Sequence, residues 1–272
     1  MIEVLEDARA LARRAVELFA ADVQSAAAAR GVATVALTGG ESPVDTYKLL
    51  GGQDVARRIP WQKVHLYWGD ERCVPPDDPQ SNFGLAQTTM LSRLSLLSAN
   101  VHRMRGEDEP HEAARAYERE LRAPPFGRGS APRRVVQAPG AARTPVLADG
   151  TGLPVFDFVF LGLGPDGHVA SLFPHAPALN EAERLCVHTV APDGGDRLSL
   201  TFPVLNAARS VVFLVNEPEK AGMVAEVIEG LRLPDAVPAQ RVRPALGQLT
   251  WLLTEAAAAE LSPAALGAAH LA

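Results

Sequence analysis

A histidine directly after a glycine-rich turn is the side chain in this sequence best suited to chemistry. The run Gly162–Pro174 reads GLGPDGHVASLFP and places His168 after three glycines. The apolar stretch before it, residues 156–161, has the length and the aromatic and β-branched content of a buried strand. In an open α/β sheet, ligands bind in the crevice at the carboxyl ends of the strands. A histidine at that position faces a substrate rather than a core, which favours a functional role.

The glycines of this run also match the GxGxxG pattern of dinucleotide-binding loops. That use needs free backbone N–H groups, a long following helix and no negative charge near the pyrophosphate. Pro165 lacks the N–H donor and Asp166 adds a carboxylate. Pro174 limits any helix that begins at His168 to about two turns. The pattern therefore gives little support to a nucleotide site.

A second glycine turn, after the strand predicted at residues 32–37, could hold an anion. Gly39 and Gly40 leave room for a ligand to approach backbone N–H groups at the positive end of a helix predicted over residues 43–50. We expect Ser42 to cap this helix, with Asp45 at capping-box spacing. The arrangement suits a phosphate group, and an ordinary strand–turn–helix junction is the equal alternative.

Charged residues follow the strand predicted at residues 64–68. Asp70 and Glu71 precede Arg72, and the three side chains could form a solvated salt bridge. Alternatively, Arg72 could present a fixed guanidinium fork to a phosphate or carboxylate group. No metal-ligand spacing accompanies the two acids.

Two more basic residues lie at the starts of predicted elements. Lys220 falls in the first turn of a helix that Glu217 and Pro218 open, where a cation is slightly unfavourable. Neutralisation by Glu217 and Glu219 would explain this lysine, and so would a bound anion. Arg197 precedes another apolar run, and its position alone decides nothing.

Composition excludes several classes of protein. The chain has 272 residues, a net charge of −6 and 47% hydrophobic residues, which is ordinary for a globular protein and argues against a nucleic-acid partner. It has no apolar run near the ~20 residues that span a bilayer, and its acidic N-terminus does not resemble a signal peptide. Cys73 and Cys186 have neither disulfide-framework nor metal-ligand spacing, so we expect a cytoplasmic protein.

Short apolar runs alternate with helical patterns along the chain, which predicts an α/β fold with a mostly parallel sheet covered on both faces. Strands are expected at 32–37, 64–68, 156–161, 185–190, 211–215 and 249–253, and helices at 1–30, 43–50, 81–97, 111–121, 218–231 and 255–261.

One segment, residues 123–154, interrupts this pattern. It holds six prolines, five glycines and four arginines against a single acid, Asp149. Few of its residues could offset the entropy cost of ordering. We expect a single domain over residues 1–272 with a flexible insertion here, either an inert spacer or a lid whose arginines reach the site.

Several catalytic motifs are absent from the sequence. It contains no GxSxG elbow, no HExxH pair and no Walker-type GxxxxGK[ST] loop. A hydrolase built on this chain would use water directly, without a serine nucleophile or a zinc ion.

Taken in order, the motifs resemble those of the 6-phosphogluconolactonase family of the pentose phosphate pathway. The resemblance covers nearly the whole chain except residues 123–154, and the DERCVP and DGHVASLFP blocks are its most specific parts. The matching stretches are LTGGESP at 37–43, WGDERCVP at 68–75 with Ser81 and Asn82, LGLGPDGHVASLFP at 161–174, Arg197, NEPEK at 216–220 and LTWLL at 249–253.

The resemblance implies a Rossmann-like three-layer α/β/α fold, shared with glucosamine-6-phosphate deaminases. It implies hydrolysis of 6-phospho-D-glucono-1,5-lactone to 6-phospho-D-gluconate, with that sugar-phosphate lactone as the small-molecule partner and no cofactor or metal. His168 would be the general base, and Asp70 and Asp166 would orient neighbouring groups. The phosphate and lactone would be held by Gly39, Gly40, Ser42, Arg72, Arg197 and Lys220.

The chain departs from the family pattern at two positions. Glu41 stands where a serine or threonine is usual, and a carboxylate is unfavourable beside a phosphate dianion. Either Glu41 turns to solvent or this part of the phosphate site is weakened. Thr254 stands where an aspartate is common, which we expect to affect a local cap more than chemistry.

Two other functions remain open. Amino-sugar-phosphate deaminases or isomerases of the same superfamily carry a tyrosine in place of Arg72 and a different sequence after DGH. A non-catalytic sugar-phosphate sensor would normally carry an added DNA-binding module, and none is visible. We expect no membrane or nucleic-acid partner and a monomer, with a dimer as the alternative.

Overall fold

The computed structural model describes residues 1–123, 125–126 and 152–269. Within these residues, six strands form a sheet in which every neighbouring pair is parallel. Its central strands are continuous apolar runs because both faces of the sheet are covered. In spatial order the strands are β1 (Ile2–Leu5), β9 (Gln248–Thr254), β8 (Ser210–Val215), β5 (Phe158–Leu161), β2 (Ala33–Leu37) and β3 (Val64–Trp68).

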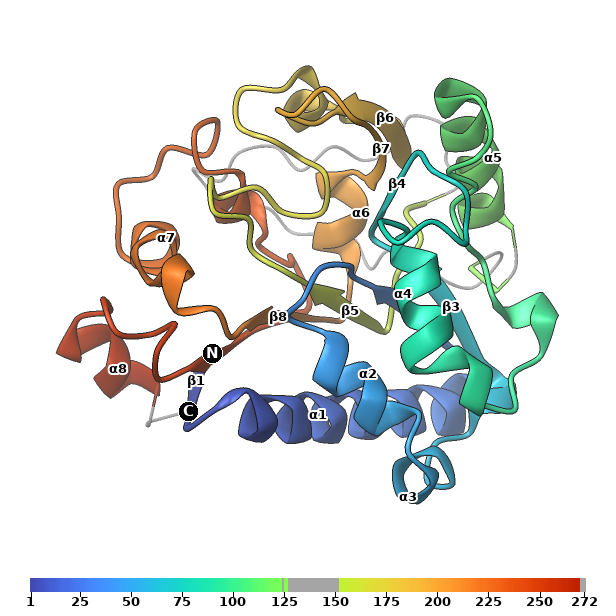
Figure 1. The fold of residues 1–272 in the computed structure, drawn as a ribbon, viewed down its shortest axis with the longest axis horizontal. Helices are drawn as coiled ribbons and strands as arrows, with labels where there is room; N and C mark the ends of the chain where they lie inside the picture. Colours follow the sequence, from blue (N-terminus) through green and yellow to red (C-terminus); the bar gives the residue numbers. More distant parts are fainter. Residues whose placement is uncertain (124, 127–151, 270–272) are drawn as a thin grey trace.

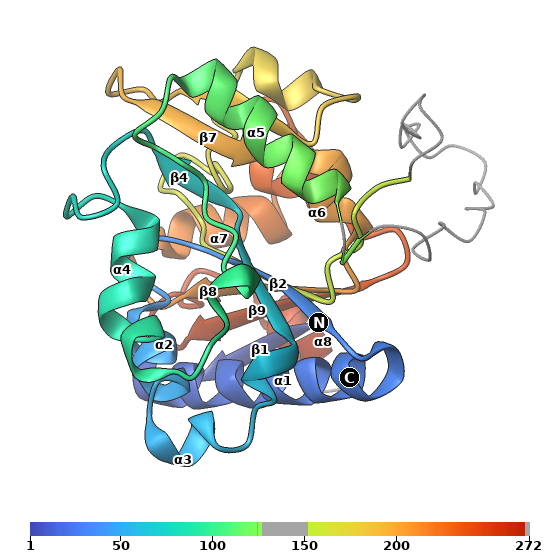
Figure 2. The same cartoon turned by 90° about the vertical axis from the view of Figure 1, so that its right-hand side faces the viewer.

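Helices cover one face of this sheet (Figures 1 and 2). An aromatic cluster lies between the layers, where the ring of Phe19 packs against those of Phe158 and Phe160 at centroid distances of 5.6 and 6.0 Å. The helices on this side and at its edge are α1 (Ala8–Arg30), α2 (Val44–Leu50), α3 (Gln53–Ala56) and α4 (Asn82–Thr89).

The opposite face carries a mixed layer of helices and a small sheet (Figure 2). In the described chain this sheet has three antiparallel strands, β4 (Asp70–Arg72), β7 (Asp196–Leu200) and β6 (Cys186–Val190). The expected three-layer α/β/α fold is confirmed, and the small sheet is an addition to it. The helices here are α5 (Pro110–Arg122), α6 (Phe202–Ala207) and α7 (Ala221–Ile228), and α8 (Pro263–Ala269) lies beside β1.

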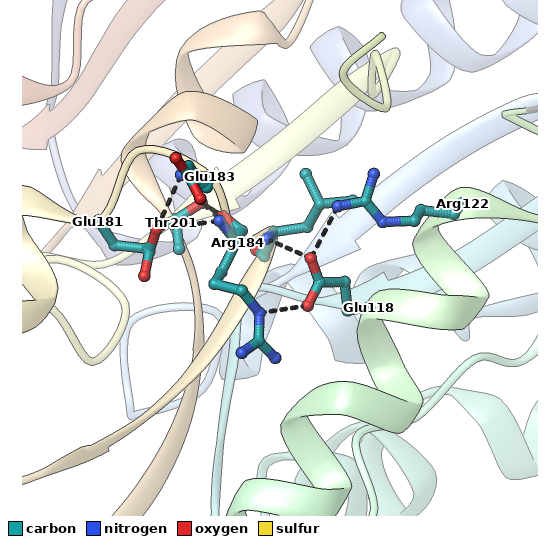
Figure 3. A network of polar contacts seen from close by, with 7 residues as sticks. Glu118, Arg122, Glu181, Glu183, Arg184 and Thr201 are labelled. Atoms are coloured by element: carbon teal, nitrogen blue, oxygen red, sulfur yellow. Dashed lines mark hydrogen bonds and ion pairs between the residues drawn. The ribbon is translucent and has the colours of Figure 1, made fainter. Parts of the chain in front are cut away.

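A buried carboxylate fastens α5 to the small sheet (Figure 3). Glu118 accepts hydrogen bonds from Arg184 Nε at 2.5 Å, from Arg122 at 2.9 Å and from the backbone N–H of Leu185 at 3.3 Å. A buried carboxylate is tolerated when its oxygens are bonded in this way. The network therefore holds the segment that leads into β6 against α5.

The N-terminus differs from the single helix expected over residues 1–30. Residues 2–5 form the edge strand β1, because their backbone pairs with β9. Asp7 then accepts a hydrogen bond from the backbone N–H of Ala10 at 2.7 Å and caps α1, which ends at Gly31 with a left-handed φ of 79°. The cap thus separates strand from helix at a position that apolar spacing alone did not reveal.

Two other expected helices differ from the structure: one is shorter than predicted, and the other does not form. The helix predicted over 81–97 ends at Thr89, where Met90 leaves the helical region with φ −134° and is fully buried. Residues 255–261 form turns rather than a helix, and the Thr254 side chain at their start donates to the carbonyl of Asn216 and accepts the backbone N–H of Ala257. The second contact is a local side-chain cap of the kind expected for Thr254, while its lack of a chemical role stays a prediction.

The strand expected at 185–190 exists as β6 but lies outside the parallel sheet. It pairs with β7, a strand that the sequence analysis did not predict. Both strands are short and half exposed, so their apolar pattern is weak, and the pairing gives them their stability.

Most of the insertion predicted at 123–154 lies outside the described residues. Its two ends belong to the core: Phe126 is 7% exposed and packs against Phe156 and Tyr67 at centroid distances of 4.9 and 5.1 Å, and Leu153 packs against the same cluster. The stretch that could be removed without losing core contacts is therefore shorter than the segment 123–154 that composition defines.

We predict that replacing residues 127–151 with a short Gly/Ser bridge leaves the melting temperature within about 3 °C, because loop closure depends weakly on length. Phe126→Ala in the full chain should instead lower the free energy of unfolding by about 3–5 kcal/mol through loss of a buried ring. Thermal and urea denaturation measure both effects. If both variants lost the same amount of stability, the core contacts of Phe126 would not be what distinguishes it from residues 127–151.

Candidate active site

Four loops meet at one edge of the parallel sheet. Because β8, β5, β2 and β3 are neighbours and run in the same direction, the loops that follow them emerge side by side. These loops carry the candidate residues of the sequence analysis except Asp70 and Arg72, which lie on β4, and Arg197, which lies on β7.

His168 lies in a tight turn that requires glycine. The backbone N–H of Gly164 donates to the carbonyl of His168 at 2.9 Å, and Gly167 adopts a left-handed φ of 79°. A Cβ atom on Gly164 would lie 2.1 Å from His168 Nδ1, so the imidazole packs directly on the backbone. No helix follows this turn within residues 168–174, so the GxGxxG pattern here lacks the helix that a dinucleotide site requires.

Asp166 holds the imidazole from one side. Its Oδ1 lies 2.5 Å from His168 Nδ1 and also accepts the backbone N–H of His168 at 3.1 Å. With Nδ1 donating its proton to a carboxylate, Nε2 keeps the lone pair of a neutral imidazole. The His168 side chain is 27% exposed, and the ring of Phe173 lies 4.7 Å from it. The arrangement can take a proton from a ligand or from water.

The environment of Asp166 keeps its carboxylate ionised. Burial alone would raise the pKa of Asp166, but the hydrogen bond and charge of His168, together with backbone N–H groups, lower it below the ordinary value. An ionised Asp166 stabilises the protonated imidazole that forms when His168 accepts a proton.

Asp70 joins the His168 loop to the small sheet. It is 7% exposed and accepts Ser171 Oγ at 2.7 Å and Asn82 Nδ2 at 3.2 Å. The backbone N–H of Ser171 donates to Ser199 Oγ at 3.2 Å, which ties the same loop to β7. The preceding residue, Ala170, has a φ of 50°, a strained conformation that these contacts maintain. Asp70 is therefore placed to hold other groups rather than to meet a ligand.

Gly39 is needed for a contact within the protein. A Cβ atom on Gly39 would lie 1.8 Å from Asn82 Oδ1, so the space next to this glycine is filled by the Asn82 amide. Gly40, with a φ of 83°, faces open space instead. Asn82 was present in the sequence motif but received no role, and it links the glycine turn to Asp70.

Glu71, the next residue along β4, binds backbone groups of the protein itself. It is buried and accepts the backbone N–H groups of Asn82 at 2.7 Å, Phe83 at 2.8 Å and Arg72 at 2.8 Å. Burial raises the pKa of Glu71, and these donors oppose that shift. Successive residues of a strand face opposite sides, so the acid pair read from the sequence is divided between two environments.

Arg72 and Arg197 are brought together by the small sheet. They are directly opposite in the antiparallel pairing of β4 and β7, on the face that also carries Asp70 and Ser199. Arg72 donates to the carbonyl of Gln80 at 2.6 Å, which uses one of the five donors of its guanidinium. Arg197 donates to the carbonyl of Asp196 at 3.0 Å and to the carboxylate of Asp193 at 3.4 Å, so its guanidinium lies against the turn between β6 and β7. The loop of His168 contacts the same sheet through Ser171, next to Asp70 and Ser199.

Ser42 does not cap α2, contrary to the sequence expectation. The residue at the cap position is Pro43, with no capping side chain, and Ser42 Oγ donates to both carboxylate oxygens of Glu217 at 2.8 and 2.9 Å. Lys220 Nζ donates to the same carboxylate at 2.8 Å, so Glu217 neutralises it. Glu41 is exposed, which confirms the first alternative given for it.

Two hollows lie outside this group of residues. One, of about 590 Å³, is formed by residues 173–178 and β6 and touches the candidate site only through Phe173. The other, of about 380 Å³, lies between α1 and residues 57–63, before β3 begins. His168 and Asp166 line neither hollow.

Both cysteines are free thiols. Among the described residues, no group of three or more His, Cys, Asp or Glu side chains could hold a metal ion. No helix in this part of the chain is long and apolar enough to cross a membrane.

Comparison with known proteins identifies the family. The sequence profile described as "Glucosamine-6-phosphate isomerases/6-phosphogluconolactonase" matches residues 6–251. The chain belongs to this family. It is 36% identical over 263 residues to a 6-phosphogluconolactonase of Synechocystis, covering 96% of this chain and 98% of the relative. It is 37% identical over 272 residues to one of Mycobacterium tuberculosis, with the same coverage.

The fold agrees with this membership of the glucosamine-6-phosphate isomerase/6-phosphogluconolactonase family. The crystal structure of a 6-phosphogluconolactonase from Thermotoga maritima superposes with a TM-score of 0.72 at 28% identity, covering 93% of this chain and 99% of the other. The likeness spans the whole architecture and not one motif.

We predict that Gly39→Ala lowers the free energy of unfolding by about 1–3 kcal/mol, because the new methyl group would displace the Asn82 amide from Asp70. Gly162→Ala is a matched control, since its nearest neighbour would be Thr38 Oγ1 at 3.9 Å, and should cost less than about 1 kcal/mol. Urea denaturation measures both. A control as destabilised as Gly39→Ala would show that the Asn82 contact is not the cause.

Proposed function

We propose that this chain hydrolyses 6-phospho-D-glucono-1,5-lactone to 6-phospho-D-gluconate in the oxidative pentose phosphate pathway, in the cytoplasm. The observation that carries the proposal is the contact of 2.5 Å between His168 and Asp166 in the crevice at the end of β5. The relatives named 6-phosphogluconolactonase, similar over nearly the full chain, support the same substrate.

His168 acts as the general base. Its Nε2 takes a proton from a water molecule as the water oxygen attacks the lactone carbonyl carbon. Asp166 stabilises the imidazolium that forms, and the imidazolium returns the proton to the ring oxygen as the carbon–oxygen bond breaks. Such proton transfer typically contributes about 10²–10⁴-fold in rate.

The phosphate group is held by cations and backbone donors around this base. Arg72 and Arg197 are opposite each other on the small sheet that the His168 loop contacts, and a pair of guanidinium groups that leave Gln80 and Asp193 suits a dianion. Ser42, which follows β2, and Lys220, which follows β8, flank the end of β5 and are joined through Glu217. The glycines of the first turn, Gly39 and Gly40, complete this set through their backbone, and Asp70 acts as a positioning residue.

One assay discriminates this function from the alternatives. Fresh phosphogluconolactone is added and acid release is followed above the spontaneous rate of ring opening. Release of ammonia from glucosamine 6-phosphate would instead indicate a deaminase, and binding without turnover of either would indicate a sensor.

We further propose that the protein acts as a monomer and binds no nucleic acid. The absence of nucleic-acid binding is in line with its net charge of −6, and sedimentation tests the oligomeric state.

We predict that His168→Asn lowers kcat about 10²–10⁴-fold and changes KM little, because the variant loses the base but none of the proposed phosphate contacts. His175→Asn is a matched control: His175 is exposed, only seven residues away, and has a left-handed φ of 59° that asparagine tolerates. Steady-state kinetics measure both. Near-wild-type turnover in His168→Asn would contradict the assignment.

The charge of Asp166 predicts a pH-dependent contribution to stability. A carboxyl group with a lowered folded-state pKa stabilises the fold above its unfolded pKa of about 3.9 and loses that effect as the pH falls through the folded value. We therefore expect wild type to be more stable than Asp166→Asn at pH 6, with the difference shrinking as the pH falls below about 3.9 and disappearing below the lowered folded-state pKa. Urea unfolding at several pH values measures it. A constant difference would contradict the ionised contact.

A further inference from the structure

A carboxylate lies between two residues that the proposed function assigns to the substrate phosphate. Glu217 accepts Ser42 Oγ with both oxygens, at 2.8 and 2.9 Å, and Lys220 Nζ with one, at 2.8 Å. The side chains of Glu217 and Lys220 are only 14% and 15% exposed. An internal anion therefore already binds the hydroxyl and the ammonium group.

The position of this contact makes it relevant to ligand entry. Ser42 follows β2, Glu217 follows β8, and β5 lies between those strands. The hydrogen bonds thus bridge the two strands that flank the end of β5, from which the His168 loop emerges. A phosphate group that reached Lys220 and Ser42 would meet the Glu217 carboxylate.

Two anions cannot share this lysine without cost. Like charges a few ångströms apart repel, and a partly buried pair is screened weakly by solvent. Burial alone would raise the pKa of Glu217, but Lys220 and Ser42 lower it, so the group carries its charge at neutral pH. Its neighbour Glu219 is exposed, and Glu41 on the glycine turn is exposed as well. Glu217 alone of these three acids contacts the proposed phosphate residues.

We propose that Glu217 is a specificity-determining residue that competes with the substrate phosphate for Ser42 and Lys220. This inference rests on the proposed function, which supplies the phosphate ligand. A phosphate dianion carries more charge and more acceptor oxygens than a carboxylate, so it can displace Glu217 from the lysine. A monoanion offers no such advantage, and Glu217 thereby excludes simple carboxylates from the site.

The test removes the charge of Glu217 and keeps its shape. Glu217→Gln should lower KM for phosphogluconolactone about fivefold or more, and leave KM for unphosphorylated D-glucono-1,5-lactone within about twofold. Glu219→Gln is the matched control, since it changes net charge equally two residues away, and should alter neither constant. The proposal is overturned if Glu217→Gln raises KM for the phosphorylated lactone or matches the control.

A binding measurement separates this inference from the proposed function. Isothermal titration with inorganic phosphate should give a Kd about fivefold lower for Glu217→Gln than for wild type or Glu219→Gln. D-gluconate, a monoanion, should bind measurably only to the glutamine variant. These results do not depend on turnover, so a wild type without lactonase activity would contradict the function alone, whereas an unchanged phosphate Kd would overturn the role of Glu217.

A second variant covers the case in which Glu217→Gln fails to fold. Glu217→Asp keeps the charge and withdraws it by one methylene group from Ser42 and Lys220. It should give a smaller fall in the phosphate Kd, about twofold. No fall at all in this variant would count against competition.

Discussion

The site depends on the buried carboxylate of Asp70. It binds Ser171 from the loop after β5 and Asn82 from the start of α4, and Asn82 lies against Gly39 in the loop after β2. An unpaired carboxylate in this setting would cost several kcal/mol, so the three loops cannot separate independently. His168, the glycine turn and the small sheet thus keep fixed relative positions, which is the condition for a preorganised site.

The two sheets contribute different residues to the candidate site, and the contacts of Asp70 connect them. The parallel sheet presents its loops along one edge and supplies His168, Ser42 and Lys220. The small antiparallel sheet pairs Arg72 with Arg197, and the carboxylate of Glu118 helps to fasten it to α5. In this chain of net charge −6, internal carboxylates neutralise two of these cations, Lys220 through Glu217 and Arg197 through Asp193.

Features that depend on neighbouring residues in the sequence were predicted well, and features that depend on distant contacts were not. Buried parallel strands such as β8 and β5 are continuous apolar runs, so they were predicted closely. The edge strand β1 was merged into α1, because four residues fit either period and only pairing with β9 decides between them. The segment 255–261 was predicted as a helix because alanine has high helix propensity, but propensity is a weak guide that tertiary context overrides.

By itself the sequence determined that His168 follows a glycine turn with Asp166 two residues before it, since contacts at such short separation depend on local backbone geometry. It also determined the parallel character of the main sheet, through the spacing of its apolar runs. Only the tertiary structure decided that Ser42 meets Glu217, 175 residues away, and that the Asn82 amide fills the space beside Gly39. These contacts depend on which strands become neighbours, and strand order is set by packing of the whole chain rather than by any local pattern.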